Sequence, residues 1–539
     1  MCRMKKIFLT LATLVCISAL NAAEKVAFLG DSITYSGRWA MLVESALRAA
    51  PRFADAEIIN FGLSSETVSG LSEPGHAGGA FPRPCLHERL TRILDAFPAT
   101  VIIACYGMND GIQMPFDRQR QLAYQKGIVE LKRVVEARGA HLILVTAPLF
   151  HFDQREKDGN NYDAVLDDQS AYLLQKRTPA WSVIDIRPDL RRSITAQKLR
   201  EPTFVFAADG VHPSHVGHSF IAQSMLPQLW PILKLPGKPW NPDEKSQAIL
   251  QQRADLLKHA WLSKTGHKRP GVPAGKLLEQ AQQEADALLK QYKAAIAPRT
   301  SHWNGFEKLD FDVAGRAALL VKPKQAATGA PWVWRTEFFG HEPQADLALL
   351  AKGYHLAYID LQNLYGAPIA MQAMDDFHAH LIARFGLSER CVLFGFSRGG
   401  LFAFNWAVRN PQNTAGLYVD APVCDFKSWP GGKGKGSGST IDWERCLKAY
   451  AFTEEQAMNY ELNPVDNLGQ LVKAKIPILA VIGDADEVVP VAENIDLVEK
   501  RYQALGGAIK VIRKPGCKHH PHSLKDPQPI VDFVLHVFR

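Results

Sequence analysis

Short apolar segments that alternate with amphipathic stretches are the feature that most constrains the fold of this chain. Five of them lie between Lys25 and Leu235, and they read KVAFLG, AEIINFG, TVIIACYG, HLILVTAP and SVIDIRP. Eight more begin near Phe306, and they read KLDFDV, RAALLVKP, PWVWRTEF, YHLAYIDL, CVLFGFS, GLYVDAP, IPILAVIGD and IKVIRKP. Because strand-like and helix-like patterns alternate, each series predicts an α/β sheet covered by helices. The close spacing of the first strands in the second series predicts an antiparallel start.

The length of 539 residues is enough for two or three domains of roughly 100–200 residues each. We expect two three-layer α/β/α domains, at residues 24–235 and 301–539. The intervening residues 236–300 are polar and strand-free and read as two helices, which predicts a helical connector. The alternative is a helical hairpin that packs on the first domain and overhangs its cleft.

The N-terminus has the pattern of a secretory signal peptide. Three basic residues within residues 1–6 precede an apolar run at 7–20, and small residues follow at 22–23. The apolar run is shorter than the roughly 20 residues that a membrane-spanning helix needs. Residues 1–23 therefore predict a cleaved signal peptide and a secreted or periplasmic protein with no integral membrane segment.

The net charge argues against nucleic-acid binding, and the cysteine content leaves the presence of a disulfide open. The net charge is +7, and removal of the three basic signal residues leaves about +4 (7 − 3), too small and scattered for a nucleic-acid partner. Of the eight cysteines, two lie in the signal. Among the other six, Cys424 and Cys446 flank one loop and are candidates for a disulfide, which an exported protein permits but does not require.

Four motifs in the first predicted domain place polar residues where strands end or helices begin. Each alone is an ordinary turn or cap, but all four in one domain indicate a site at the ligand-binding edge of a sheet. They are Gly30-Asp31-Ser32-Ile33-Thr34, Gly62, Gly107-Met108-Asn109-Asp110 and Asp209-Gly210-Val211-His212.

These residue types suit nucleophilic catalysis. The hydroxyl of Ser32 is a poor nucleophile until a base takes its proton, and His212 is the candidate base. Asp209, three residues earlier, can fix the imidazole tautomer and stabilise the imidazolium. The amides of Ser32 and Gly62 and the side chain of Asn109 are candidate oxyanion donors.

The set GDSIT, Gly62, GMND and DGVH resembles the motifs of the GDSL/SGNH hydrolase family, and the resemblance spans nearly the whole first domain. It implies a flavodoxin-like three-layer fold and ester hydrolysis through an acyl-enzyme. It also implies that Ser32 is the nucleophile, that Asp209 and His212 are its partners, and that Ser32, Gly62 and Asn109 donate to the oxyanion. Asp31, beside the nucleophile, is a candidate for substrate binding.

The second series contains Gly395-Phe396-Ser397-Arg398-Gly399 between a strand and a helix, which is the context of a nucleophile elbow. An acid and a base should follow in that order, and two loops supply them: one holds Asp484 and Asp486, the other His519 and His520.

This half, about residues 306–539, is similar to the α/β-hydrolase superfamily, nearest to its exported esterase and prolyl-oligopeptidase-like members. The resemblance implies Asp486 as acid and His519 as base, with Asp484 and His520 as competitors. The amide of Arg398 is one expected oxyanion donor. The loop Trp334–Gly340 departs from the His-Gly-Gly pattern of the superfamily, so a second donor is not assigned.

Arg335 and Glu337, in that departing loop, are candidates either for substrate binding or for a buried ion pair. The cluster His519, His520 and His522 has no carboxylate or cysteine at ligand spacing, so we predict no metal site there. We also predict no organic cofactor, because the serine mechanism needs none.

The loop 430–439 (PGGKGKGSGS) reads as a flexible surface loop. Its position, after the strand that follows the elbow helix, is also where lids are inserted in the superfamily. In that case Lys433 and Lys435 would attract an anionic substrate.

The leading hypothesis is an exported bifunctional serine esterase that removes acyl groups, above all acetyl, from a carbohydrate or glycan. One alternative is a lipase or phospholipid esterase. Another is a single active N-terminal esterase whose second domain acts as a binding module or as a peptidase. The expected partner is an acylated carbohydrate or other ester substrate, not a nucleic acid.

Overall fold

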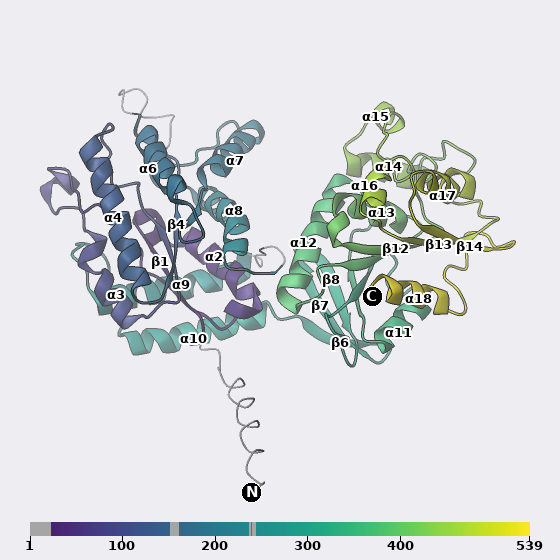
Figure 1. Cartoon of the computed structure of the whole chain (residues 1–539), viewed down its shortest axis with the longest axis horizontal. Coiled ribbons are helices and arrows are strands. Elements are labelled where there is room, and N and C mark those ends of the chain that lie inside the picture. Colours follow the sequence, from purple (N-terminus) through teal and green to yellow (C-terminus); the bar gives the residue numbers. More distant parts are fainter. Residues whose placement is uncertain (1–22, 151–160, 237–238, 240–243, 539) are drawn as a thin grey trace, which may run out of the picture. The chain divides into compact units, whose positions relative to one another are not determined.

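The computed structural model describes residues 23–150, 161–236, 239 and 244–538, in two compact units that each contain one sheet (Figure 1). By contacts, the first unit comprises Met1–Lys234 and Gln247–Tyr292, and the second comprises Leu235–Ser246 and Lys293–Arg539. All but the last residue of the predicted signal peptide lies outside the described residues.

The first sheet is fully parallel, as predicted, and has the strand order β2-β1-β3-β4-β5. In a doubly wound sheet of this order, ligands bind beyond the carboxyl ends of the strands where the order reverses, here between β1 and β3. The strands are β1 (Lys25–Gly30), β2 (Glu57–Asn60), β3 (Val101–Cys105), β4 (His141–Val145) and β5 (Ser182–Ile184).

Helices cover both faces of this sheet. Trp39 packs edge-on against Phe28 of β1, so helix α2 covers one face, where α8 and α7 join it. Helices α3, α4 and α6 share a hydrophobic core with the other face. Their bounds are α1 (Ser32–Tyr35), α2 (Arg38–Ala49), α3 (Leu90–Ala96), α4 (Arg118–Glu136), α6 (Tyr162–Lys176), α7 (Arg187–Arg200) and α8 (His215–Ile232).

Helices α9 (Glu244–Thr265) and α10 (Leu278–Ala295) occupy the region that the sequence describes as a connector or a packed hairpin. Trp261 of α9 contacts Phe61 and Phe97 with ring centroids 5.7 and 5.4 Å apart. Leu257 of α9 and Ala281 of α10 belong to the same core. The two helices are therefore a structural part of the first unit, and the domain bounds drawn from the sequence stay predictions.

The second sheet has nine strands in the order β14-β13-β12-β11-β9-β10-β8-β7-β6. Three neighbouring pairs are antiparallel: β6 with β7, β7 with β8, and β8 with β10. The remaining pairs are parallel. The predicted antiparallel start is confirmed. The strands are β6 (Arg299–Trp303), β7 (Phe306–Val313), β8 (Arg316–Lys322), β9 (Trp332–Arg335), β10 (His355–Ile359), β11 (Cys391–Phe396), β12 (Thr414–Asp420), β13 (Ile478–Gly483) and β14 (Ile509–Lys514).

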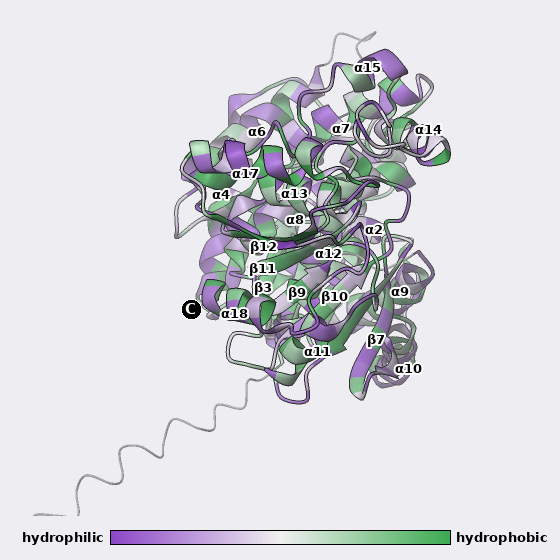
Figure 2. Ribbon diagram, turned by 90° about the vertical axis from the view of Figure 1, so that its right-hand side faces the viewer, coloured by the Kyte–Doolittle hydropathy of each residue, from purple (hydrophilic) through white to green (hydrophobic). Residues whose placement is uncertain are grey.

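Burial along this sheet follows strand position. The central strands β11 and β12 are buried throughout, and β11 is largely green in Figure 2, whereas β7, near one edge, is only partly buried and carries purple segments. The edge strand β6 reads RTSHW and lacks an apolar run, which is why the sequence did not predict it. The C-terminal tip of β11, where the predicted elbow lies, is thus held in the middle of the sheet.

Helices again cover both faces. One hydrophobic cluster joins the sheet to α12, α13, α16 and α17, another joins it to α11 and α18, and a smaller cluster includes α14. The bounds are α11 (Gln344–Ala351), α12 (Pro368–Phe385), α13 (Gly399–Arg409), α14 (Thr440–Tyr450), α15 (Glu454–Met458), α16 (Gly469–Lys473), α17 (Ile495–Ala504) and α18 (Gln528–Val537).

Two further findings concern the described residues only. No helix among them is both long and apolar enough to cross a membrane. Their six cysteines are all thiols, so Cys424 and Cys446, both buried, form no disulfide in this structure.

Candidate active sites

The structure brings Ser32, His212 and Asp209 into one chain of hydrogen bonds. The Oγ of Ser32 lies 2.8 Å from Nε2 of His212, and Nδ1 of His212 lies 2.6 Å from Oδ2 of Asp209. Ser32 opens α1 at the tip of β1, and the other two residues lie in the loop before α8. The arrangement matches a nucleophile, a base and an orienting acid at the switch point of the sheet.

The carboxylate of Asp209 is fixed and ionised. Its second oxygen, Oδ1, accepts the amides of Val211 and His212 at 2.9 and 2.8 Å. Partial burial opposes the charge, but the hydrogen bonds from His212 and Val211 outweigh burial and lower the pKa of Asp209 to about 2. Asp209 therefore remains negative at any physiological pH, where it can stabilise a positive imidazole.

Gly62 and Asn60 connect the loop after β2 to the turn that carries the serine. A Cβ at position 62 would lie 2.5 Å from the amide nitrogen of Tyr35, so only glycine fits. The amide of Gly62 donates to Oδ1 of Asn60 at 2.8 Å, and Nδ2 of Asn60 donates to the carbonyl of Thr34 at 2.7 Å. The predicted oxyanion donor at Gly62 is thus engaged by Asn60 in this state.

The third predicted donor, Asn109, is held by a residue that sequence reasoning missed. Nη1 of Arg83 donates to Oδ1 of Asn109 at 2.8 Å, and Nδ2 of Asn109 donates to the carbonyl of Glu66 at 3.2 Å. The guanidinium of Arg83 is in turn bound by both carboxylate oxygens of Glu73. These bonds fix the orientation of the amide, and its NH₂ group has a second hydrogen that can be donated to an oxyanion.

Asp31, predicted to bind substrate, is only 3% exposed and acts as a helix cap. Its Oδ1 accepts the amide of Ile33 at 2.9 Å. Burial, with Asp110 adding to it, raises the pKa of Asp31 to about 7 despite that hydrogen bond. The structure corrects the substrate-binding assignment, because the carboxyl is enclosed by protein.

The Asp31 carboxyl should make stability depend on pH. Its pKa is higher in the folded state than in the unfolded chain, so its contribution is complete below about pH 4 and is lost as pH rises through about 7. The side chain of the Asp31→Asn variant cannot ionise. We therefore expect the free energy of unfolding of the variant, relative to that of the parent, to be higher at pH 8 than at pH 5 by on the order of a few kcal/mol. Thermal unfolding of both proteins at the two pH values measures this gain, and an equal difference at both pH values would contradict it.

The second unit holds a second chain of the same kind. Oγ of Ser397 lies 3.0 Å from Nε2 of His519, and Nδ1 of His519 lies 2.6 Å from Oδ2 of Asp486. Ser397 has a φ of +49° between β11 and α13, the sharp and strained turn that a nucleophile elbow requires. Asp486 and His519 are both buried, so this site is more enclosed than the first.

The geometry separates the competing acids and bases. Oδ1 of Asp484 accepts the amide of Gly516 at 2.7 Å, so Asp484 fixes a loop instead of His519. The ring of His520 packs against His341 and His522 and makes no contact of its own with Ser397 among those described. His519 is the histidine that contacts Ser397, and Asp486 is the carboxylate that contacts His519.

Arg335 lies in a buried ion pair. Its side chain is 1% exposed, forms a two-pronged ion pair with Asp346, and lies over the ring of Phe396 at 3.8 Å. The alternative of a buried ion pair was right for Arg335, but its partner is Asp346, not Glu337. Glu337 instead lies 3.4 Å from Nε of Arg398.

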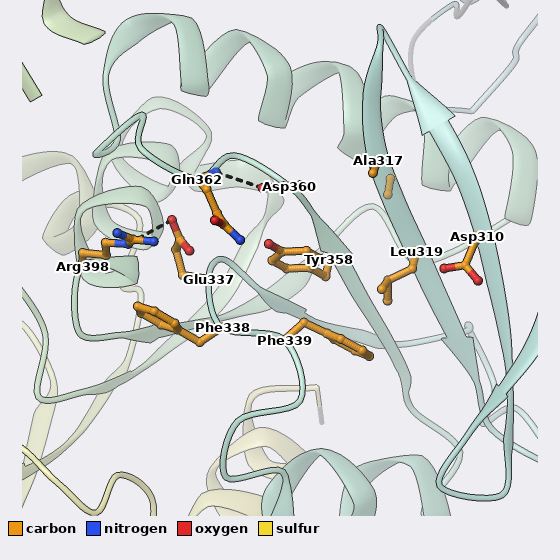
Figure 3. Close-up of a pocket in the computed structure, with 11 residues that line it drawn as sticks. Asp310, Ala317, Leu319, Glu337, Phe338, Phe339, Tyr358, Asp360, Gln362 and Arg398 are labelled. Atoms are coloured by element: carbon orange, nitrogen blue, oxygen red, sulfur yellow. Dashed lines mark hydrogen bonds and ion pairs between the residues drawn. The ribbon is translucent and has the colours of Figure 1, made fainter. Parts of the chain in front are cut away.

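Beside the elbow lies a cavity of about 480 Å³, which we call the Glu337 pocket (Figure 3). Burial raises the pKa of the Glu337 carboxyl, although Arg398 opposes the shift. In Figure 3 Arg398 and Glu337 face each other at one end, with the rings of Phe338, Phe339 and Tyr358 beside them. The lining residues are Asp310, Ala317, Ala318, Leu319, Glu337, Phe338, Phe339, Tyr358, Asp360, Gln362 and Arg398.

Both lysines of the glycine-rich loop 430–439 make contacts that hold the loop in place. Nζ of Lys433 forms an ion pair with Glu454 at 2.6 Å, and the amide of Lys435 donates to Glu493 at 2.5 Å. The Lys433 ion pair opposes the idea that this lysine attracts an anionic substrate.

Known structures that resemble this chain do so weakly. A puromycin-hydrolysing peptidase from Mycobacterium tuberculosis is 13% identical, over 44% of this chain and 37% of its own, with a TM-score of 0.32. An acylaminoacyl peptidase from Pyrococcus horikoshii is 14% identical, over 43% and 40%, also at 0.32. A membrane phospholipase A, described as a bacterial virulence factor, is 16% identical, over 49% and 92%, at 0.30. The chain spans about two fifths of the length of the two peptidases, and none of these matches assigns it an activity.

A family comparison is more specific for the first unit. Residues 28–220 match the GDSL-like Lipase/Acylhydrolase family, and the matched range contains Ser32, Asp209 and His212. The second unit is an α/β fold with a serine elbow at the centre of its sheet. Residues 28–220, with the Ser32, His212 and Asp209 chain inside them, therefore match a GDSL-like lipase/acylhydrolase domain.

Proposed function

We propose that this chain is an exported bifunctional serine esterase that removes acyl groups, above all acetyl, from a carbohydrate or glycan. The observation that carries the proposal is the presence of two separate Ser–His–Asp chains, with serine-to-histidine distances of 2.8 and 3.0 Å. A fold retained only for binding would not need the second set to remain assembled. Export rests on the N-terminal sequence pattern.

In the first site, Oγ of Ser32 attacks the ester carbonyl carbon while Nε2 of His212 takes the hydroxyl proton. The negative Asp209 stabilises the imidazolium. The oxyanion is bound by the amide of Ser32 and by Nδ2 of Asn109, and by the amide of Gly62 once its bond to Asn60 opens. His212 returns the proton to the departing alkoxide, and a water molecule then cleaves the acyl-enzyme by the same steps.

In the second site, Ser397, His519 and Asp486 take the same roles, and the amide of Arg398 donates to the oxyanion. The Glu337 pocket lies next to Arg398 and is the proposed place for the part of the substrate that carries the ester. Its carboxylates and amide can bind hydroxyl groups, and its three aromatic rings offer flat apolar faces.

Electrostatics favours a sugar over a phospholipid in this pocket. Three carboxyl groups and one guanidinium line it, and an anionic headgroup would meet net negative charge. The same carboxyl groups would accept an ammonium group, which makes cleavage of an aminoacyl ester or peptide the second candidate for Ser397.

The test is acyl release by the parent, Ser32→Ala, Ser397→Ala and the double variant. Nitrophenyl esters of increasing chain length, acetylated xylan, acetylated pectin, O-acetylated sialoglycans and aminoacyl nitroanilides form the substrate panel. We expect acetate from at least one polysaccharide or glycan, lost in one or both single variants. Rates that rise steadily with acyl length, with no acetate from any glycan, would favour a lipase and contradict the proposal.

A further inference from the structure

Three histidines from two loops of the second unit meet beside the Ser397 site. They are His341, in the loop after β9, and His520 and His522, in the loop after β14. One ring nitrogen of each lies within 4.8 Å of the others. The sequence drew attention to His520 and His522 but not to His341, which lies 179 residues earlier than His520 in the chain and is brought in only by folding.

One of the three rings is already oriented as a metal ligand would be. Nδ1 of the buried His522 lies 2.8 Å from Oδ1 of Asp420, which is itself fully buried at the end of β12. Oδ2 of Asp420 accepts the amide of Ser523 at 2.8 Å and the hydroxyl of Tyr418 at 2.9 Å. A carboxylate on one ring nitrogen sets the tautomer and leaves the lone pair of Nε2 available to a metal, as in carboxylate–histidine–metal arrangements.

Hydrogen bonds from two basic side chains fix the backbone of the two loops that carry the histidines. Nη2 of Arg335 donates to the carbonyl of Glu342, the neighbour of His341. Nζ of Lys514 donates to the carbonyls of Pro521 and Ser523, which flank His522. The buried Arg335 and the anchored Lys514 therefore hold the backbone of the cluster in place, while the rings of His341 and His520 remain exposed and can turn.

We propose that His341, His520 and His522 form a zinc site. Three neutral imidazoles suit zinc, and bonds of about 2.0–2.1 Å in a tetrahedron require nitrogens about 3.4 Å apart. The present separations extend to 4.8 Å, so metal binding requires the two exposed rings to turn toward His522. His519 is not a ligand, because its two nitrogens face Asp486 and Ser397. A water molecule would complete the shell on the exposed side.

The test uses the full chain without a histidine tag, stripped with a chelator and dialysed. Cobalt(II) serves as the spectroscopic probe, and zinc is added in competition. We expect one equivalent of cobalt at micromolar concentration, with the visible absorption of a four-coordinate ion, and its displacement by zinc. His341→Gln should weaken binding at least about tenfold, and Asp420→Asn, which frees the His522 ring, about 10- to 100-fold.

The matched control is His302→Gln, which removes an exposed histidine on β6 and should leave binding unchanged. His341 is exposed, so its variant is expected to fold even if changes at His522 or Asp420 do not. The proposal is overturned if the parent binds no cobalt in this range, or if His341→Gln binds as tightly as the parent, which would place the ion elsewhere. Neither result bears on the esterase proposal, which the acyl-release assays judge separately.

Discussion

Ser32→Ala is expected to lower kcat/KM for short-chain esters by at least about 10⁴-fold when measured in the Ser397→Ala background. The substitution removes the atom that attacks the carbonyl but leaves His212 paired with Asp209 at 2.6 Å. What remains is the stabilisation of the oxyanion and substrate binding, which alone accelerate hydrolysis about 10³- to 10⁴-fold over water. The second site must be silenced first, because its own turnover would otherwise hide the loss.

The control for Ser32→Ala is Ser219→Ala on α8. Within the described part of the chain, the hydroxyl of Ser219 bonds to the carbonyl of His215 in its own helix, so its loss should leave kcat/KM within about twofold. A fluorophosphonate probe gives a second readout, since it should label the Ser397→Ala protein at Ser32 and fail on the double variant. Retention of most activity in Ser32→Ala would refute the assignment of the nucleophile.

Much of the fold was predictable because its strands are short apolar runs. All thirteen segments identified from the sequence become strands, and those at the centre of each sheet are buried on both faces. The exception, β6, pairs with β7 at the sheet edge and needs no apolar run. Neither the packing of α9 through Trp261 nor the partner of the buried Arg335 could be read from local patterns, because both depend on tertiary contacts.

The six proposed catalytic residues were predictable for a different reason. Each lies in a short sequence motif at a strand tip, a helix start or a tight turn, where the local backbone geometry restricts which residues can occur. Arg83, which orients Asn109, and His341, which joins the histidine cluster, lie in loops with no periodic pattern. Long-range folding alone brings them to their partners, so a single sequence carries no local signal for either.

Ser397→Ala tests whether the second unit is an enzyme or a binding module. Alanine keeps the Cβ at a φ of +49°, so the strain of the elbow is unchanged and the protein should fold normally. In the Ser32→Ala background the substitution removes the nucleophile that lies 3.0 Å from His519, and we expect the remaining ester or peptide hydrolysis to fall by at least about 10³-fold.

The set of substrates whose hydrolysis is lost in Ser397→Ala is informative because the two sites differ in how far they are buried. His519 and Asp486 are buried, whereas the side chains of His212 and Asp209 are half exposed. The more enclosed site should therefore discriminate more strongly among substrates, and the activity lost in Ser397→Ala should be confined to part of the panel. Ser388→Ala, three residues before β11, is the matched control, since among the described residues its Oγ accepts the amide of Arg390 and has no bond to the site. If the double variant equals Ser32→Ala on every substrate while both remain folded, the assembled Ser397 triad does no chemistry on these bonds, and the second unit is a recognition module for the first.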